Sequence, residues 1–311
     1  MSCKVVVLIP AYNCGKYIAD TIRTILNQSY RNVDIIIIND GSTDNTHDLI
    51  SGFASTNEKI LYINRTENKG VIATRNELLR NVPHDAKYIA WCDSDDLYHY
   101  DKIKEQVRFL DLNSKIIGCG TWYKVFGSQK RKVRKFRCSD VVDKQLLFGS
   151  PIGFPTFMQR VTPQIRFNVE LKSAEDYDYL YQISKIGKLT NISFYGTMYR
   201  THPNQESTSN KNRQLYYHQK ISEYIFFERI GSILGKEEIE LLLFPNVTKG
   251  NIRKYLNIED RLTSIDKSEH LKIILAYRFL SYNKKKLLFL IRYSFNRFKV
   301  MFKLYKLFWY K

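Results

Sequence analysis

Three closely spaced carboxylates are the first residues whose types and spacing suggest chemistry. Asp93, Asp95 and Asp96 directly follow an apolar run in the segment KYIAWCDSDDLY, residues 87–98. On an extended strand end, residues two apart point the same way, so Asp93 and Asp95 should face one side. Such a pair can hold Mg²⁺ or Mn²⁺, because these ions favour oxygen ligands, often together with substrate phosphates. The alternative is a solvated turn that caps a following helix.

The apolar pattern of the first half predicts the elements that position these carboxylates. Short β-branched runs at residues 4–10, 33–40, 60–64 and 87–93 predict strands. Helices are expected between them, at about 16–28, 41–53 and 71–81. This alternation predicts an α/β fold with a mainly parallel sheet, which binds ligands beyond the carboxyl ends of its strands. Residues 10–13, 40–44 and 93–96 all lie at such ends, so they should line one crevice.

Composition limits the domain organisation and the compartment. The 311 residues are 44% hydrophobic and 14% aromatic, which indicates a folded chain. After Gly118 the alternation weakens, and helical patterns dominate from about Lys211. We therefore expect an α/β domain over residues 1–210 and a helical region over 211–311. Five scattered cysteines without a C-x-x-C pair, and no signal peptide or membrane-spanning run, predict a cytoplasmic protein.

Five sequence motifs follow one another in the first two thirds of the chain. They are IPAYNCGKYIADTIRTILNQSY (9–30), IIINDGSTDNT (36–46), NRTENKGVIATRN (64–76), WCDSDD (91–96) and SAEDYD (173–178). Together they resemble the family 2 glycosyltransferases, over about residues 4–210. The resemblance implies a Rossmann-like GT-A fold with a C-terminal helical appendage, a nucleotide-diphosphate-sugar donor, and Mn²⁺ or Mg²⁺ as cofactor.

The resemblance also implies a role for each matching residue. Those implied to bind the donor are Pro10, Ala11, Tyr12, Asn13, Asp40, Asn68, Arg75, Asp93, Arg200 and His202. Among these, Asp40 would read the uracil, while Arg200 and His202 would belong to a loop that closes over the diphosphate. Asp95 would be the metal ligand. Asp176 would be the catalytic base, because an acceptor hydroxyl becomes a good nucleophile only when its proton is withdrawn. Direct displacement assisted by one base would invert the anomeric centre.

Several of these assignments have a structural alternative. Arg75 could be a surface residue of its helix, and His202 a plain loop residue. Glu175 could be the base in place of Asp176. Asp178, two residues further on, is expected to be a charge on the helix surface.

Two basic segments carry much of the net charge of +18. Residues 284–311 have helical periodicity that places five cations in one sector: Lys285, Arg292, Lys299, Lys303 and Lys306. A basic stripe beside aromatic residues suits a helix at an anionic membrane surface, although the helix could instead pack on the catalytic domain. The second segment, KRKVRKFR (130–137), could meet a lipid diphosphate or headgroups, or form a solvated hairpin.

These observations predict an inverting, metal-dependent hexosyltransferase that uses a UDP-sugar. The expected acceptor is GlcNAc- or GalNAc-diphospho-undecaprenol in O-antigen (lipopolysaccharide) or capsule synthesis, at the cytoplasmic face of the inner membrane. A sugar-nucleotide nucleotidyltransferase is the alternative enzyme, but residues 9–17 lack the Gly-rich, basic loop that it needs. The non-enzymatic alternative is a nucleic-acid-binding protein, against which the acidic crevice argues, so we expect no nucleic acid partner.

Overall fold

The structure is a computed structural model that describes residues 2–203, 211–231, 234–245 and 251–282. The chain divides into two compact units. Unit 1 comprises residues 1–135 and 152–211, and unit 2 comprises residues 136–151 and 212–311. The expected tail, residues 284–311, lies outside the described residues.

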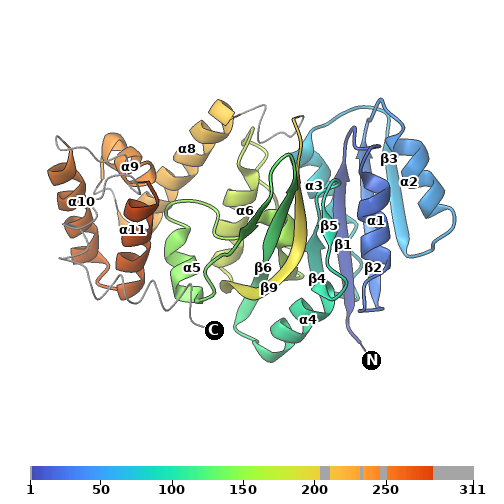
Figure 1. The fold of residues 1–311 in the computed structure, drawn as a ribbon, viewed down its shortest axis with the longest axis horizontal. Coiled ribbons are helices and arrows are strands. Elements are labelled where there is room, and N and C mark those ends of the chain that lie inside the picture. Colours follow the sequence, from blue (N-terminus) through green and yellow to red (C-terminus); the bar gives the residue numbers. More distant parts are fainter. Residues whose placement is uncertain (1, 204–210, 232–233, 246–250, 283–311) are drawn as a thin grey trace. The chain divides into compact units, whose positions relative to one another are not determined.

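Unit 1 is built on one mixed sheet (Figure 1). In the described residues its strands follow the order β3-β2-β1-β4-β8-β6-β9-β5, and β7 pairs with β6. The strands are β1 (Lys4–Ala11), β2 (Val33–Asp40), β3 (Ile60–Arg65), β4 (Ala86–Trp91), β5 (Leu97–Tyr98), β6 (Ile116–Gly127), β7 (Arg131–Val133), β8 (Met158–Arg160) and β9 (Lys188–Thr201). The first four are mutually parallel and confirm the predicted strands. β8 is antiparallel to both β4 and β6, so the second half of the sheet is mixed.

Helices connect the parallel strands, as the alternation predicts. They are α1 (Ile18–Leu26), α2 (Thr46–Ala54) and α3 (Val71–Arg80), while α4 (Lys102–Leu112) and α6 (Glu175–Ser184) follow later in unit 1. The core contains the fully buried strand residues Val5, Val7 and Ile9, and the apolar stripe of α1 packs with them through Ile18 and Ile22. Because β1 is buried on both faces, only its carboxyl end can present polar groups to a ligand.

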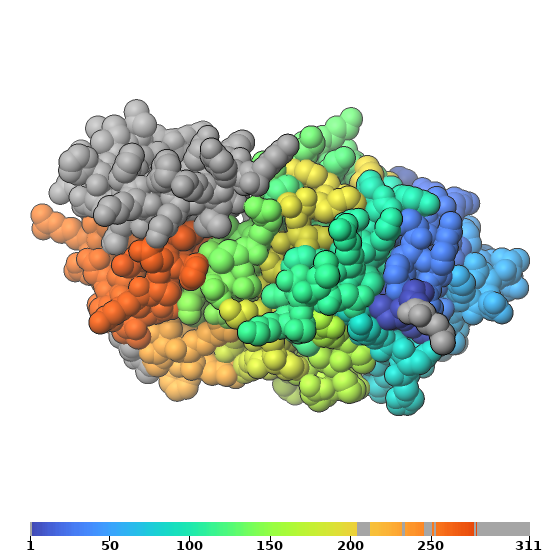
Figure 2. All heavy atoms as spheres, turned by 90° about the horizontal axis from the view of Figure 1, so that it is seen from below, coloured from blue at the N-terminus to red at the C-terminus, as the bar shows by residue number. Residues whose placement is uncertain are grey.

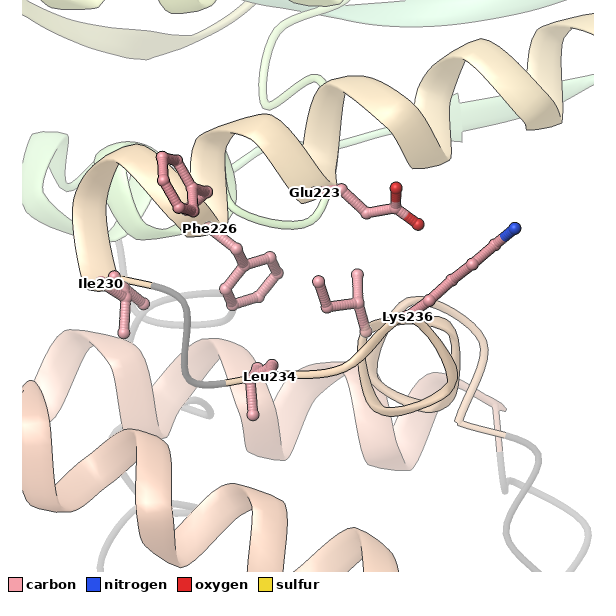
Figure 3. Close-up of a pocket in the computed structure, with 8 residues that line it drawn as sticks. Glu223, Phe226, Ile230, Leu234 and Lys236 are labelled. Carbon is pink, nitrogen blue, oxygen red and sulfur yellow. The ribbon is translucent and has the colours of Figure 1, made fainter.

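Unit 2 is helical in its described part. Its helices are α5 (Ser139–Gln145), α8 (Lys211–Ile230), α9 (Lys236–Leu243), α10 (Ile252–Ile265) and α11 (Glu269–Tyr282). None of the helices in the described ranges is both long and apolar enough to cross a bilayer. Side chains of α8, of α9 and of Leu234 ahead of α9 surround a small pocket, among them Phe226 and Ile230 (Figure 3). None of the predicted site residues lines it.

Residues 136–151, expected in the α/β domain, group with unit 2 in the structure. Their apolar side chains explain why. Val141, Val142 and Phe148 are buried, and the Phe148 ring lies 5.4 Å from that of Phe226 in α8. The Arg278 guanidinium of α11 covers the same Phe148 ring at 5.0 Å.

Candidate functional site

The acidic segment lies at the carboxyl end of β4, where the sequence predicts a ligand site. The backbone turns here, because the Asp96 N–H donates to the Asp93 carbonyl oxygen at 3.2 Å. The Asp93 side chain is one third exposed and that of Asp95 is 17% exposed, whereas Asp96 is fully buried. Asp93 and Asp95 can therefore contact a ligand, and Asp96 has an internal role.

A buried arginine links this segment to the first turn of α6. Arg75, in α3, donates from Nη1 to Glu175 Oε1 at 2.5 Å, and its Nη2 lies 3.6 Å from Asp93 Oδ1. The rings of Phe154 and Phe167 cover the guanidinium at 4.8 and 5.5 Å. The side chain is only 9% exposed, so the surface-residue alternative for Arg75 is wrong. Low-dielectric surroundings strengthen its attraction to both carboxylates.

The predicted base Asp176 lies beside this ion pair. It stands in the first turn of α6, next to Glu175, and its Oδ1 accepts the Tyr177 N–H at 2.8 Å. Burial raises the pKa of Asp176 to about 6, the neighbouring Glu175 charge adds to the rise, and Arg75 opposes it. A carboxyl group whose pKa lies close to neutral pH is suited to act as a general base.

The pKa of Asp93 is raised by burial and neighbouring negative charges, as that of Asp176 is. Burial raises the pKa of Asp93 to about 7, against the opposing effect of Arg75. The charges of Asp95, Asp176 and Glu175 raise it further. Lys135 is close enough to Asp176 to be stabilised as a cation by it, although burial lowers the pKa of Lys135 overall. Negative charge is therefore concentrated where a cation or a positively charged transition state would be favoured.

The end of β9 contacts the acidic segment through Arg200. The Arg200 N–H donates to Asp96 Oδ1 at 2.8 Å, and Arg200 Nε donates to the Asp95 carbonyl oxygen at 2.8 Å. The Arg200 guanidinium lies over the rings of Tyr17 and Phe126 at 4.6 and 4.5 Å. The buried Asp96 carboxylate thus holds Arg200 in place beside the exposed acids.

His202 follows on the same segment and meets the predicted metal ligand. Its Nε2 lies 3.0 Å from Asp95 Oδ2, and its ring lies 5.0 Å from that of Tyr17. A carboxylate oxygen and an imidazole nitrogen at this separation form a donor pair that Mn²⁺ accepts. The remainder of the expected closing loop, residues 204–210, lies outside the described residues.

The loops after β1 and β2 are bonded to each other at the carboxyl ends of these strands. Asn13 adopts a positive φ of 46°, its N–H donates to Ser42 Oγ at 2.9 Å, and its Oδ1 accepts the Thr43 N–H at 2.8 Å. Asn tolerates this left-handed conformation better than most residues do. Tyr12, the neighbouring predicted residue, is 50% exposed and available to stack on a ligand.

Asp40 is held firmly at the end of β2. Its Oδ1 accepts Arg65 Nη1 at 2.7 Å and the Lys69 N–H at 3.0 Å, and its Oδ2 accepts the Gly70 N–H at 2.9 Å. Asp40 therefore fixes the loop before α3. In that loop the exposed Asn68 accepts the same Gly70 N–H at 2.9 Å.

The remaining predicted donor residues are Pro10 and Ala11, which end β1 next to Asn13. The structure thus places the predicted residues along one edge of the unit 1 sheet. Sequence reasoning missed the anchoring of Arg200 by Asp96 and the pairing of Glu175 with Arg75. Only contact between distant segments reveals these pairs, since the second spans 100 residues.

The expectation that Asp178 is a charge on the helix surface is wrong. Asp178 is only 6% exposed, and burial raises its pKa. The reason lies in α6, whose residues Tyr177, Tyr179, Leu180 and Tyr181 are all buried. A helix surrounded in this way has no broad solvent face.

Comparison with known proteins identifies the family. Residues 6–207 match the model of glycosyl transferase family 2. The chain belongs to glycosyl transferase family 2. This confirms the resemblance drawn from the five motifs, and it makes the protein a glycosyltransferase.

Individual relatives agree with this assignment. An uncharacterised glycosyltransferase of Haemophilus influenzae is 29% identical over 311 residues, covering 94% of this chain and 91% of its own length. TuaG of Bacillus subtilis, named for a proposed role in teichuronic acid biosynthesis, is 36% identical over 104 residues. That match covers 33% of this chain and 40% of TuaG.

Solved structures confirm the GT-A fold. Staphylococcus aureus TarS 1–349, crystallised with UDP-GlcNAc, superposes with a TM-score of 0.61 at 16% identity, over 94% of this glycosyltransferase and 92% of the TarS chain. The mannosyltransferase PcManGT from Pyrobaculum calidifontis, in complex with GDP-Man and Mn²⁺, gives a TM-score of 0.54 at 14% identity. That superposition covers 90% of this chain and 86% of PcManGT.

Proposed function

We propose that this glycosyltransferase transfers a hexose or N-acetylhexosamine from a UDP-sugar to a sugar acceptor with inversion at the anomeric carbon. One observation carries the proposal. The carboxylate suited to act as a base, Asp176, shares a single charge cluster with Asp93 through Glu175 and Arg75. Deprotonation of the acceptor and binding of the donor can therefore occur side by side.

Asp176 has the properties that the base step requires. With a pKa of about 6, Asp176 is still mostly ionised at neutral pH, and the rise in pKa makes its carboxylate a stronger base toward the proton of an acceptor hydroxyl. The acceptor oxygen would then attack the anomeric carbon as the bond to UDP breaks. Glu175 is bonded to Arg75 and serves less well as the base. A single base acting on the attacking oxygen predicts inversion.

A divalent cation fits the opposite side of the cluster. Asp95 and His202 would hold it, because their oxygen and nitrogen donors converge within 3.0 Å and Asp93 adds negative charge nearby. When bound, Mn²⁺ or Mg²⁺ would neutralise charge on the donor diphosphate. Arg200, anchored between Tyr17 and Phe126, would contact the same diphosphate as it leaves.

The nucleoside would bind against residues 10–13, Asp40 and Asn68. Hydrogen bonds between the loops after β1 and β2, and from the Lys69 N–H to Asp40, would hold these residues in place before the donor binds. The TarS structure with UDP-GlcNAc supports UDP as the nucleotide, since the two folds superpose over most of both chains.

The acceptor we propose is GlcNAc- or GalNAc-diphospho-undecaprenol in O-antigen or capsule assembly. TuaG, named for a proposed role in teichuronic acid biosynthesis, supports a biosynthetic role of this kind. Lys135 beside Asp176 supports an acceptor that carries negative charge. We place the enzyme on the cytoplasmic face of the inner membrane, with the basic tail, residues 284–311, as one attachment.

The proposal is tested by incubating the full chain with Mn²⁺, a panel of UDP-, GDP- and dTDP-sugars, and synthetic GlcNAc- or GalNAc-diphospho-lipids. We expect one UDP-sugar to add a single sugar mass by mass spectrometry, with inverted configuration by NMR. EDTA should abolish the product and added Mn²⁺ should restore it. Asp95→Asn should require at least tenfold more Mn²⁺. A retained configuration, or full activity in EDTA, would contradict the mechanism.

A further inference from the structure

The edge of the sheet formed by β6, β7 and the end of β9 has an unusual charge pattern. Residues 116–135 and 188–201 contain no Asp or Glu. Six of their cations are exposed: Lys124, Lys130, Arg131, Lys132, Arg134 and Lys188. In the space-filling view, green and yellow atoms, the colours of β6–β7 and β9, meet at the surface (Figure 2). We call the set Trp122, Lys124, Lys130, Lys132, Arg134 and Tyr195 the cationic face.

Strand pairing holds these cations together. Lys124 of β6 lies directly opposite Lys132 of β7 in the antiparallel register. Like charges at opposed positions destabilise a sheet, so this pairing favours an anionic partner that would neutralise both. The next cross-strand partner of Lys124, on β9, is Met198, which is 39% exposed. The face therefore presents cations beside an exposed apolar side chain.

The aromatic residues Trp122 and Tyr195 contact the cations of this face. The Arg134 guanidinium covers the Trp122 ring at 5.2 Å, and its Nε donates to the Tyr195 hydroxyl at 3.0 Å. Lys124 Nζ lies 5.8 Å from the centroid of the Tyr195 ring, and the Trp122 and Tyr195 rings are 5.4 Å apart. Trp122 Nε1 donates to the Lys135 carbonyl oxygen at 2.9 Å. Trp and Tyr held at a surface together with Lys and Arg are typical of proteins that bind at a membrane interface.

We propose that the cationic face docks on the surface of an anionic lipid bilayer. The charge, the lack of acidic residues and the exposed Met198 suit anionic headgroups above an apolar layer. Nucleic acid suits the face less well, because bases stack on open aromatic rings. Here Arg134 covers Trp122, Lys124 lies over Tyr195, and both rings are half-buried.

Docking would also serve the proposed reaction. β7 leads along the chain into Lys135, which is close to Asp176. A bilayer against β7 would therefore bring a lipid-linked diphosphate toward the acceptor side of the site. This consequence rests on the proposed function, whereas the docking itself does not.

The first test measures binding of the full chain to vesicles of phosphatidylcholine with and without 30 mol% phosphatidylglycerol. Lys124→Gln/Lys132→Gln should weaken binding to the anionic vesicles by roughly 10- to 30-fold, since each cation contributes roughly fivefold. The matched control is Lys104→Gln/Arg108→Gln, which removes two exposed cations from α4. The control should lose less than threefold. Equal losses in both variants would show that only net charge matters and would overturn the proposal.

The second test locates the contact and is independent of the tail. The chain has three tryptophans, Trp91, Trp122 and Trp309, and Trp91 is buried. In a Trp309→Phe chain, headgroup spin-labelled lipid in anionic vesicles should quench the Trp122 emission by a third or more. Quenching should fall in Lys124→Gln/Lys132→Gln at equal bound protein. Bound protein with unquenched Trp122 would overturn the proposal, as would single-stranded DNA that displaces the vesicles from this face at physiological salt.

Transfer to a soluble, short-chain acceptor should be unchanged in Lys124→Gln/Lys132→Gln. If no acceptor is glycosylated by either protein, the proposed function fails, and the vesicle and quenching results still decide the docking proposal.

Discussion

Replacing Glu175 with Gln should move the acid limb of the pH–rate profile to lower pH. Burial and the Glu175 charge are the two largest causes of the raised pKa of Asp176. Gln keeps an oxygen that accepts the Arg75 hydrogen bond, so the side-chain arrangement should persist while the negative charge is lost. Without that charge, the Asp176 carboxylate becomes easier to ionise.

The size of the shift follows from Coulomb's law. Two like charges about 6 Å apart at an effective dielectric of about 20 interact by roughly 3 kcal/mol, or about 2 pKa units. Arg75 contacts Glu175 at 2.5 Å and already cancels much of its charge. We therefore expect the pKa of Asp176, about 6 in the native enzyme, to fall by roughly 0.5–1 unit.

The assay is kcat/KM for transfer between pH 5 and 8, because its pH dependence reports ionisation of the free enzyme. Only the position of the acid limb is compared, since loss of a buried charge partner also lowers stability. Asp178→Asn is the matched control, because it removes a buried carboxylate from the same helix that is not among the main causes of the raised pKa of Asp176. An unmoved limb in Glu175→Gln, or the same shift in Asp178→Asn, would refute the reasoning.

Two further predictions concern stability. Gly41→Ala should lower the free energy of unfolding by roughly 2 kcal/mol, because φ is +69° and the new Cβ would lie 2.6 Å from the Glu67 backbone carbon. Gly52→Ala in α2 should instead raise it by roughly 0.5–1 kcal/mol, because the new Cβ would have no atom within 4 Å. If thermal unfolding ranks the two variants in the opposite order, the loop geometry at Gly41 is contradicted. Asp96→Asn should stabilise the metal-free protein more at pH 8 than at pH 5. Burial raises the pKa of Asp96 in the folded protein well above its value in the unfolded chain, so the native protein loses stability as the pH rises, and Asn removes that loss. The Asn side-chain oxygen can still accept the Arg200 N–H. Urea unfolding at the two pH values measures the difference, and a pH-independent effect would contradict a buried, electrostatically strained Asp96.

The first half of the fold was predictable from sequence because each buried parallel strand is a continuous apolar run. β1, β2, β3 and β4 all appear where those runs predict them. Two elements of the second half were not, because β8 has three residues and α5 has seven. Elements this short show no periodicity, and only their packing identifies them.

Only part of the candidate site could likewise be predicted from sequence. Residues 10–13, Asp40 and Asp93 lie at strand ends, and strand ends can be located from local pattern. The support of these residues comes from distant segments. Arg200 reaches Asp95 across 105 residues, and no local spacing encodes that pairing. The burial of Asp178 is likewise a property of what surrounds α6, not of its own sequence.

The most direct test of the central claim is the transfer rate of Asp176→Asn, measured together with its affinity for UDP in the presence of Mn²⁺. General-base catalysis contributes about 10²–10⁴-fold, so kcat should fall by at least 100-fold. The UDP dissociation constant by calorimetry should change less than threefold, since Asp95 and His202 are untouched. Transfer at more than a tenth of the native rate, with UDP bound normally, would contradict the assignment of Asp176 as the base.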